Sequence, residues 1–497
     1  VWPVKHWHSV WHHESHALLG FHSSPFRSAL VVSYDGCGND GCFTVYVAQG
    51  QRIYRLARKT LNLGHAYKEV ASFIPEVTGV GEQQFQSMCD TVTQTRALDD
   101  TSLVVRMKQT TNPLTFAGKM MGFSGTARPS KRASRWFQRF FEDYDGRTYA
   151  QCKDVPFPTA ALRLICRSAK MRQVVAASAQ EEFGKYVASL VAGFLQTLKE
   201  KKLLVEGIVL TGGCALNVLV NQLVRENLTS FTASEPDSRE PRDVFVPAAP
   251  NDSGLGIGGV WSLFPPAAQQ PLQYLGFRLW DEEILDSEAL RRGAQRLSSL
   301  GGTQFLAELL AGGEAWQKSS GARKKRKPIV AVVRGRQEVG PRALGHRSLL
   351  AVPDSHEVRE RMNKVKFRQW YRPVAPMIAE EALEEVFGHK FRSSYMEFAP
   401  MVKKAVRERF PALTHFDGTA RHQSVSRTDE PFIHSLLLAV AKYTGLAALI
   451  NTSFNTRGRP IVNTVRECME MLDELEDLDY VLIEDWLFKA PEHKRAR

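Results

Sequence analysis

The chain lacks long apolar runs and paired cysteines, and each absence excludes a class of protein. One of its longest apolar stretches, Ser435 to Leu449, is interrupted by Lys442 and Gly445, whereas a membrane-spanning helix needs roughly 18 to 20 apolar residues. The seven cysteines are odd in number and none belongs to a C-x-x-C pair, so neither a disulfide framework nor a cysteine zinc site is predicted. These absences predict a soluble, cytoplasmic protein that has no membrane partner.

The N-terminus lacks both a start residue and a targeting signal. The chain begins with Val1, and its first ten residues contain neither the apolar core of a signal peptide nor an Arg/Ser-rich transit pattern. These features are consistent with a fragment of a longer protein.

The composition is that of a globular protein with a basic balance. A chain of 497 residues, 43% hydrophobic and 24% charged, is long enough for two or three domains. The net charge of +12, from 65 basic and 53 acidic residues, raises nucleic acid as a partner. However, eight of the basic residues lie in two runs, 323–327 and 493–497, and such runs are usually solvated linkers or tails. We therefore do not expect a nucleic-acid partner.

A hairpin is predicted near the N-terminus. From Ser28 to Arg58, two β-rich runs flank a turn rich in glycine and aspartate. The first strand, from Ala29 to Tyr34, delivers Asp35 and Gly36 to this turn. A carboxylate at the end of a buried strand, beside glycines, suits a phosphate or a phosphate-bound metal.

Two strand–turn–helix units follow in the N-terminal half. A long helical pattern from Gln173 to Lys202 precedes the segment LLVEGIVLTGGCALNVLVNQLV, which is typical of a strand, a glycine turn and a helix. The second unit runs from Val244 to Val260, with a glycine-rich helix start at Ser253. Such turns can present backbone N–H groups to an anion. Together with the hairpin they predict a nucleotide-binding α/β domain, and no internal repeat is evident.

The pattern changes in the middle of the chain. From Gly301 to Lys327 the periodicity is lost and Gly, Ser and charged residues accumulate, which is typical of a linker. A fresh strand, IVAVVRG, begins after Pro328. We therefore predict a first domain over residues 1–270, a connecting segment with a basic linker over 271–327, and a second α/β domain over 328–497.

Three histidines crowd into the segment WHHESHALLGF. The stretch from His13 to His16 is one residue too short for the H-E-x-x-H helix of zinc proteases. His12 and His16, however, have the i, i+4 spacing that places two imidazoles on one helical face, where both can reach one ion together with Asp35. An exposed histidine-rich helix is the alternative that this segment alone leaves open.

Seven motifs together resemble a known family. HHESHALLGF, VSYDGCG, LTGGCALN, VPAAPNDSGLGIGG, GRQEVGPRALGHRSLLA, RPVAPMI and LINTSFNTRGRPIV occur in the order found in the NodU/CmcH-type O-carbamoyltransferases. The resemblance extends from His12 to about Asp485. It implies an actin-like ATPase domain, similar to threonylcarbamoyl-transferases, followed by a YrdC-like α/β domain.

The resemblance also implies a reaction. Carbamoyl phosphate and ATP, the latter with Mg(II), would form a carbamoyl-adenylate in the YrdC-like domain. The carbamoyl group would then pass to a hydroxyl of a small-molecule acceptor, such as a secondary metabolite or a sugar, in the other domain. The acceptor and the oligomeric state are not specified by the sequence.

Carried over residue by residue, the resemblance implies two groups of ligands in the first domain. The metal ligands would be His12, His16, Asp35 and Asp252, a donor set that suits Fe(II) or another divalent metal. The nucleotide and cofactor contacts would fall on Asp35, Gly36, Lys119, Gly212, Gly213, Asn217 and Asp252. Lys119 matches the lysine of an E-x-K-x-M-G segment, in which Ala117 replaces the glutamate.

In the second domain the resemblance implies a site for two polyanions. Its catalytic residues would be Arg342, Arg347, Lys366, Arg372, Asn451, Ser453 and Asn455, and Arg368 lies within the same basic segment. Guanidinium groups bind phosphate oxygens two at a time, and the amide and hydroxyl groups would add neutral donors. The alternative is a basic surface patch without a ligand.

Two departures leave alternatives open. Only eleven residues precede His12, whereas the family has a longer segment there, so the chain is N-terminally shortened. Either the sequence is partial or the domain lacks its first phosphate loop. In addition, the polar stretch from Gly79 to Pro113 is predicted to be an inserted or diverged loop. The rival functions are a tRNA threonylcarbamoyl-adenosine modification enzyme and a truncated, non-catalytic relative that binds nucleotide or metal.

Overall fold

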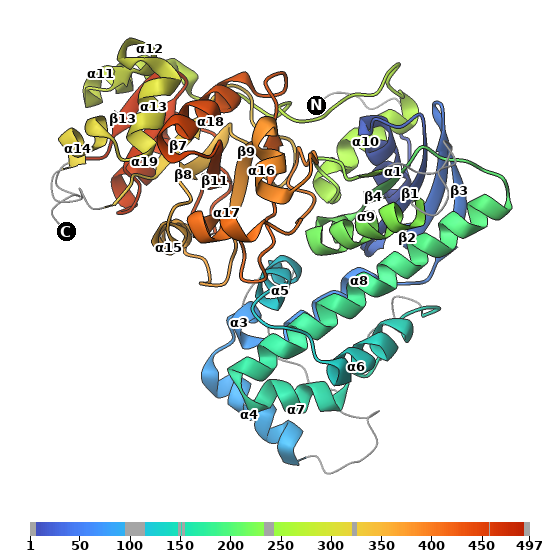
Figure 1. Cartoon of the computed structure of the whole chain (residues 1–497). Coiled ribbons are helices and arrows are strands. Elements are labelled where there is room, and N and C mark those ends of the chain that lie inside the picture. The colour runs from blue at the N-terminus through green and yellow to red at the C-terminus, as the bar shows by residue number, and fades with distance from the viewer. Residues whose placement is uncertain are drawn as a thin grey trace. The chain divides into compact units, whose positions relative to one another are not determined.

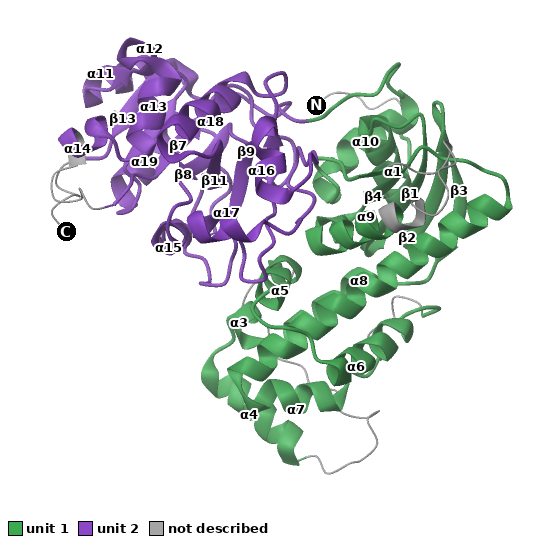
Figure 2. Cartoon of the chain, in the orientation of Figure 1, with its two compact units in different colours: residues 1–272 green, residues 273–497 purple. Residues whose placement is uncertain are grey.

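The computed structural model describes residues 6–94, 115–147, 151, 155–232, 243–320, 326–456 and 458–491. The chain divides into two compact units, Val1–Leu272 and Gln273–Arg497 (Figure 2). Each unit contains its own β-sheet and covering helices, so the fold class is mixed α/β (Figure 1). Within the described ranges, no helix has the length and apolar character needed to cross a membrane.

The first unit is built on a five-stranded sheet with the order β3-β2-β1-β4-β5. Its strands are β1 (Ser28–Gly38), β2 (Gly41–Gln49), β3 (Arg52–Lys59), β4 (Gly207–Thr211) and β5 (Asp243–Phe245). The first three strands pair antiparallel, whereas β1, β4 and β5 pair parallel. The predicted hairpin is therefore confirmed. The inner strand β4, between β1 and β5, is buried along its whole length, as its continuous apolar sequence indicates.

Helices surround this sheet and extend beyond it (Figure 1). They are α1 (His12–Ser23), α2 (Leu63–Ser72), α3 (Pro75–Thr78), α4 (Glu82–Gln94), α5 (Phe116–Ser124), α6 (Lys131–Glu142), α7 (Thr159–Arg167), α8 (Ala169–Glu200), α9 (Val218–Thr232) and α10 (Leu255–Leu263), with the short 3-10 helices η3 (Gly213–Leu216) and η4 (Asp252–Gly254). The long helix α8 confirms the helical pattern, and β4–η3–α9 and β5–η4–α10 confirm the two strand–turn–helix units.

Two expectations for this unit are wrong. The stretch from Gly79 to Pro113 is not a loop over Glu82–Gln94, because these residues form α4, and its part beyond residue 94 lies outside the described residues. Cys89 of α4 and Cys166 of α7 form a disulfide, with their Cα atoms 5.3 Å apart. The sequence could not indicate this pair, because the packing of α4 on α7 joins positions 77 residues apart.

The second unit is built on an eight-stranded mixed sheet with the order β10-β9-β11-β8-β7-β12-β13-β6. Its strands are β6 (Gln295–Arg296), β7 (Val330–Val333), β8 (Arg347–Ala351), β9 (Ala375–Ala379), β10 (Gln423–Val425), β11 (Ala448–Ser453), β12 (Tyr480–Ile483) and β13 (Trp486–Lys489). Along β7, Val330 and Val332 belong to one hydrophobic core, whereas Ala331 and Val333 belong to another. Because side chains alternate along a strand, the two cores lie on opposite faces of the sheet.

The helices of this unit include the segment that was predicted to be a linker. They are α11 (Leu285–Arg292), α12 (Leu297–Leu300), α13 (Gly302–Leu310), α14 (Glu314–Ser320), α15 (His356–Val365), α16 (Leu383–Phe387), α17 (Lys404–Arg409), α18 (Pro431–Thr444) and α19 (Val465–Glu474), with the 3-10 helices η5 (Glu282–Ile284), η7 (Glu380–Ala382) and η8 (Pro411–Leu413). The linker prediction is wrong for the described part of 301–327. Leu306 and Leu310 of α13 are buried, and α13 packs on α18.

Candidate functional site

The first candidate site begins at the N-terminus of α1, which the β1–β2 turn holds in place. Asn39 Oδ1 accepts a hydrogen bond from the His12 N–H at 2.9 Å, and Asp40 Oδ1 accepts one from the His13 N–H at 3.0 Å. Trp11, at the N-cap position, supplies no side-chain cap. The turn therefore satisfies N–H groups that a helix start leaves unpaired, and it fixes where the two histidines begin.

Close glycine contacts determine how α1 packs. A Cβ atom on Gly258 of α10 would lie 1.9 Å from the Ser15 carbonyl oxygen, and one on Gly20 would lie 2.7 Å from a methyl group of Val209 in β4. Neither approach leaves room for a side chain. Glycine at these two positions therefore allows α1 to pack closely against both β4 and α10.

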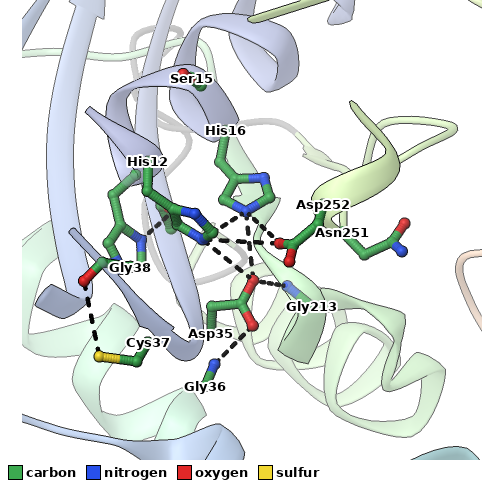
Figure 3. Close-up of polar contacts among 12 residues, drawn as sticks. His12, Ser15, His16, Asp35, Gly36, Cys37, Gly38, Gly213, Asn251 and Asp252 are labelled. Atoms are coloured by element: carbon green, nitrogen blue, oxygen red, sulfur yellow. Dashed lines mark hydrogen bonds and ion pairs between the residues drawn. The ribbon is translucent and has the colours of Figure 1, made fainter. Parts of the chain in front are cut away.

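Four side chains from three segments converge beside α1 (Figure 3). The Nε2 atoms of His12 and His16 lie 3.2 Å apart. Asp35 Oδ2 lies 3.8 Å and 3.3 Å from these two nitrogens, and Asp252 Oδ1 lies 3.7 Å and 3.5 Å from them. The four ligand atoms all fall within 4.8 Å of one another. The structure thus brings together the four residues that were predicted to be metal ligands.

Asp35 is held in the ionised form by its surroundings. It occupies the irregular end of β1, where it accepts hydrogen bonds from the N–H groups of Gly36 and Gly213, each at 2.6 Å. Burial alone would raise the pKa of Asp35, but the bonds to His12, His16 and these two N–H groups outweigh it and lower the pKa below its ordinary value. The site therefore presents a charged carboxylate.

The cluster has a closed side and an open side. The His16 side chain is fully buried, whereas that of Asp252 is 69% exposed. Burial lowers the pKa of His16, but its bonds to Asp252 and Asp35 outweigh this effect and raise the pKa above its ordinary value. The Nδ1 atom of His16 is buried and has no hydrogen-bond partner among the described residues. A ligand can therefore reach the cluster from the Asp252 side.

His13 is buried too, but it lies outside the cluster. Its Nε2–H donates to the Gly41 carbonyl at 3.0 Å, so its Nδ1 accepts a hydrogen bond from the Ser33 hydroxyl at 2.7 Å. Burial lowers the pKa of His13 to about 4. His13 is therefore a neutral residue that ties α1 to the hairpin.

The glycine turn supports Asp35 and does not offer free N–H groups. The Gly213 N–H is bonded to Asp35, and the Gly212 N–H donates to the Pro250 carbonyl at 2.8 Å. Gly212 has a φ of 87°, and a Cβ there would lie 2.2 Å from the Tyr34 carbonyl oxygen. The expectation that this turn presents its N–H groups to an anion is corrected, because both groups already have acceptors within the unit.

The remaining predicted residues of this unit lie in other surroundings. The Asn217 amide makes two hydrogen bonds with the Gln180 amide, at 3.1 Å and 3.0 Å. Lys119 lies half-buried on α5, with its Nζ atom 5.6 Å from the centre of the Phe116 ring. Nucleotide contacts of Asn217 and Lys119 stay predictions.

The second candidate site lies in the other unit and starts with residues 338–348, here called the arginine loop. Glu338 Oε1 accepts hydrogen bonds from the N–H groups of Leu344 at 2.7 Å, His346 at 2.7 Å and Arg347 at 3.1 Å. A single carboxylate oxygen thereby holds three main-chain N–H groups of the loop together. The sequence does not reveal this role of Glu338, because it depends on the conformation of the loop.

Two buried side-chain amides on strands of the sheet bind the arginine loop. Asn451 Nδ2 donates to the Ala343 carbonyl at 2.7 Å, and Gln423 Nε2 donates to the Leu344 carbonyl at 3.0 Å. Asn451 was predicted to contact a phosphate or the carbamoyl group, but its amide N–H group is directed at the protein backbone. It supports the loop that carries Arg342.

Arg347 has a structural role, which corrects its predicted contact with phosphate. Its side chain is fully buried. The guanidinium donates to the carbonyl oxygens of Arg334 at 2.9 Å, His346 at 2.8 Å and Gly335 at 3.1 Å. Because these donors already have acceptors and are shielded from solvent, Arg347 stabilises the loop and β8.

Five basic side chains, among them Arg342, lie close together in the region where the anion site was predicted. Arg342, Lys366, Arg368, Arg372 and Arg421, here called the cationic cluster, act electrostatically on one another. Burial and neighbouring cations lower the pKa of Arg342 to about 10, that of Arg368 to about 9 and that of Lys366 to about 6.

Among the described residues, the cationic cluster has no counter-ion. Within the described ranges, the guanidinium groups of Arg342, Arg368, Arg372 and Arg421 have no hydrogen bond and no ion pair. These four arginines are half-buried, and charges that are partly removed from water normally have partners, because desolvating an unpaired charge is unfavourable. The cluster therefore has the character of an anion site. Arg421 was not predicted, since it stands alone before β10 and its neighbours in space are distant in sequence.

Three of the predicted residues meet at Lys366. Its Nζ donates to the Ser453 carbonyl at 2.5 Å, to the Asn455 carbonyl at 2.7 Å and to the Asn455 side-chain oxygen. The adjacent residue, Phe367, has a φ of 47°. The C-terminal end of β11 thereby positions the one lysine of the cationic cluster.

Comparisons with known proteins agree over both units. Residues 4–260 match the family model described as carbamoyltransferase N-terminus, and residues 323–490 match that described as carbamoyltransferase C-terminus. Nodulation protein NolNO of Sinorhizobium fredii is 28% identical over 495 residues, which cover 97% of this chain and 63% of that protein. Nodulation protein U of Rhizobium tropici is 35% identical over 259 residues, which cover 51% of this chain and 39% of that protein.

A third relative is named as an enzyme. The 3'-hydroxymethylcephem-O-carbamoyltransferase of Streptomyces clavuligerus is 40% identical over 158 residues, which cover 32% of this chain and 30% of that protein. The chain thus spans less than two thirds of the length of each of these three relatives. The matches confirm the resemblance to NodU/CmcH-type proteins, and the chain belongs to the carbamoyltransferase family.

Proposed function

We propose that this chain is an O-carbamoyltransferase that transfers a carbamoyl group to a hydroxyl of a small molecule. The family supports the reaction class, as does the cephem relative that is named as an O-carbamoyltransferase. The observation that carries the proposal is the cationic cluster, which has no counter-ion among the described residues and can therefore bind two polyanionic substrates in one place.

The second unit, in the proposed role of a YrdC-like domain, forms a carbamoyl-adenylate. Carbamoyl phosphate, ATP and water give the carbamoyl-adenylate, pyrophosphate and phosphate, so atoms balance. Arg342, Arg368, Arg372 and Arg421 bind the phosphate groups and offset their charge as it moves to the leaving groups. Ser453 and Asn455 accept hydrogen bonds from the Lys366 amino group and so fix it beside these arginines, where it takes up a proton when a phosphate group binds.

The first unit, in the proposed role of an actin-like ATPase domain, carries out the transfer. His12, His16, Asp35 and Asp252 would hold Fe(II) or another divalent metal, since two imidazole nitrogens and two carboxylates are a donor set that such ions accept. When bound, the metal would neutralise charge on the adenylate phosphate. The hydrogen bonds of Gly36 and Gly213 to Asp35 keep that carboxylate ionised and oriented before any ligand arrives.

The decisive experiment measures pyrophosphate released from ATP by the purified chain, with and without carbamoyl phosphate. Release that requires carbamoyl phosphate is expected. A panel of hydroxyl acceptors with labelled carbamoyl phosphate then measures the transfer. Nucleotide binding without release of pyrophosphate would favour a non-catalytic relative. Retention of tRNA at physiological salt would favour a tRNA-modifying enzyme.

A further inference from the structure

His346, in the arginine loop, is surrounded by hydrogen-bond acceptors on both ring nitrogens. Its Nδ1 lies 2.7 Å from the Arg336 carbonyl oxygen, and its Nε2 lies 2.6 Å from Glu430 Oε2. A carbonyl oxygen only accepts hydrogen bonds, so Nδ1 carries a proton, and an ionised carboxylate requires a proton on Nε2 as well. The geometry therefore fits an imidazolium ion.

An aromatic ring covers this imidazolium. The rings of Tyr274 and His346 are stacked, with their centres 3.8 Å apart and their planes at 13°. The Tyr274 hydroxyl donates to the Leu344 carbonyl at 2.9 Å. A cation over the face of an aromatic ring is stabilised by the ring quadrupole, and here the same tyrosine also binds the loop that carries the cation.

The main chain of His346 connects the loop to β7. Its N–H is one of the three that donate to Glu338, and its carbonyl oxygen accepts from the Arg334 N–H at 3.0 Å. Its side chain reaches Glu430, which is the N-cap residue of α18 and also accepts from the Ile433 N–H at 3.3 Å. His346 thus joins the end of β7, the arginine loop and the start of α18.

We infer that protonated His346 is a positioning residue, which clamps the arginine loop between β7 and α18 and so holds Arg342 in the cationic cluster. The inference rests on the proposed adenylate-forming activity of this unit. Without its Nε2 proton, the ring would place a lone pair 2.6 Å from the Glu430 carboxylate. Repulsion would then separate the loop from α18, and Arg342 would no longer be fixed relative to the other cations.

The charge of His346 depends on several groups around it. The titratable or charged groups that face it or its main chain are Glu430 at the start of α18, Glu338 and Arg347 in the arginine loop, and Tyr274. Burial lowers the pKa of His346, but Glu430, Glu338 and the Arg336 carbonyl outweigh burial and raise the pKa above its ordinary value. The clamp is therefore complete below about pH 6.5, the pKa of free histidine, and opens as pH rises through the higher folded-state pKa.

The first test measures carbamoyl-phosphate-dependent pyrophosphate release by the full chain across the pH range. For His346→Gln we expect an apparent KM for carbamoyl phosphate raised about tenfold, with a smaller change in kcat, because substrate contacts are misplaced while the cations remain. For Glu430→Gln we expect the alkaline loss of activity to begin at lower pH. Glutamine can still accept at the helix cap, so this variant tests the charge.

A matched control is available on α18 itself. His434 is buried and, like His346, pairs with a carboxylate, with its Nε2 atom 2.9 Å from Glu381 Oε1, but it lies outside the arginine loop. His434→Gln should keep the wild-type KM and pH profile. A His346→Gln chain that is folded, as judged by its circular dichroism, and has the KM and pH profile of the wild type would overturn the inference.

A second measurement separates failure of the clamp from failure of the proposed function. The wild-type chain is labelled with 13C at histidine Cε1 and measured without substrate. The resonance that is absent from the His346→Gln spectrum belongs to His346, and in the wild type it should titrate above pH 6.5. Amide hydrogen exchange at Leu344, His346 and Arg347 should be faster in His346→Gln than in His434→Gln. Titration at or below the free-histidine value, or equal exchange, overturns the inference. If His346 titrates above pH 6.5 and these three amides exchange more slowly in the wild type than in His346→Gln, but the wild type releases no pyrophosphate, the clamp is supported and the proposed function is overturned.

Discussion

The Nε2 atoms of His12 and His16 lie 3.2 Å apart on one face of α1, and both face the carboxylates of Asp35 and Asp252. Two ring nitrogens directed at the same point from successive helical turns are the geometry that the i, i+4 spacing provides. The intervening His13 makes its hydrogen bonds with the hairpin. The histidines of this segment therefore have two different roles.

The first prediction separates these roles by metal content. His12→Ala and His16→Ala should each lose stoichiometric Fe(II) or Zn(II), because each removes one of two imidazole ligands. His13→Gln should retain the metal but unfold more easily, by about 1 to 3 kcal/mol, since it disturbs buried hydrogen bonds to Ser33 and Gly41. Elemental analysis and thermal denaturation measure the two effects. Equal metal content in all three variants would contradict the assignment.

Local patterns suggested His12, His16 and Asp35 as ligands and the family resemblance added Asp252, whereas the supports of this site depend on contacts that are distant in sequence. The spacing of His12 and His16 follows from helix geometry, and the glycine turns marked where strands pass into helices. The capping of α1 by Asn39 could not be predicted, because it requires the hairpin to lie at the helix start. In the same way, nothing in the sequence around Arg421 indicates the other cations that lie near it.

The contrast between Arg342 and Arg347 has the same origin. Both arginines belong to one motif, so the sequence predicts both as phosphate ligands. Only the three-dimensional loop distinguishes them, because it directs the Arg347 guanidinium at backbone carbonyls and leaves that of Arg342 without a partner among the described residues. The fold class was predictable from strand and helix patterns, but the helix α13 was not, because its short apolar pattern lies among glycines and charges.

The second prediction concerns the packing of α1 on α10. Gly258→Ala should lower the free energy of unfolding by several kcal/mol and weaken metal binding, because the new methyl group would lie 1.9 Å from the Ser15 carbonyl oxygen and displace the helix with both histidines. Gly256→Ala is the matched control on the same helix, since a Cβ there meets nothing within 4 Å. The control should be as stable as the wild type or more stable by up to about 1 kcal/mol. Chemical denaturation and metal titration of the two variants test this prediction. If α1 can shift freely, Gly258→Ala and Gly256→Ala should have the same stability and the same metal affinity.

The third prediction separates the two arginines of the loop. Arg342→Ala should lower carbamoyl-phosphate-dependent pyrophosphate release at least tenfold, about 1.4 kcal/mol of transition-state stabilisation, with little effect on stability. Arg347→Ala should lower the free energy of unfolding by about 3 kcal/mol, since three carbonyl oxygens each lose one hydrogen-bond donor and a fully buried side chain is removed. Denaturation curves and pyrophosphate assays distinguish the outcomes. A stable, fully active Arg342→Ala chain would show that this guanidinium does not contact substrate.

The fourth prediction concerns protons taken up when an anion binds to the cationic cluster. Burial, together with Arg368 and Arg372, lowers the pKa of Lys366 to about 6, so most of this lysine is neutral at pH 7. A bound phosphate group favours the ammonium form and raises the pKa again, so binding at pH 7 should take up nearly one proton, about 0.9 from the size of the shift. Below the folded-state pKa the lysine is already charged and the uptake should disappear. Calorimetric titration with ATP, in two buffers of different ionisation enthalpy, measures this number. Lys366→Arg is the control, because arginine remains charged across the range. Subtracting its proton uptake removes the contribution of the nucleotide itself, and an identical uptake in both chains would mean that Lys366 is already charged before the anion binds.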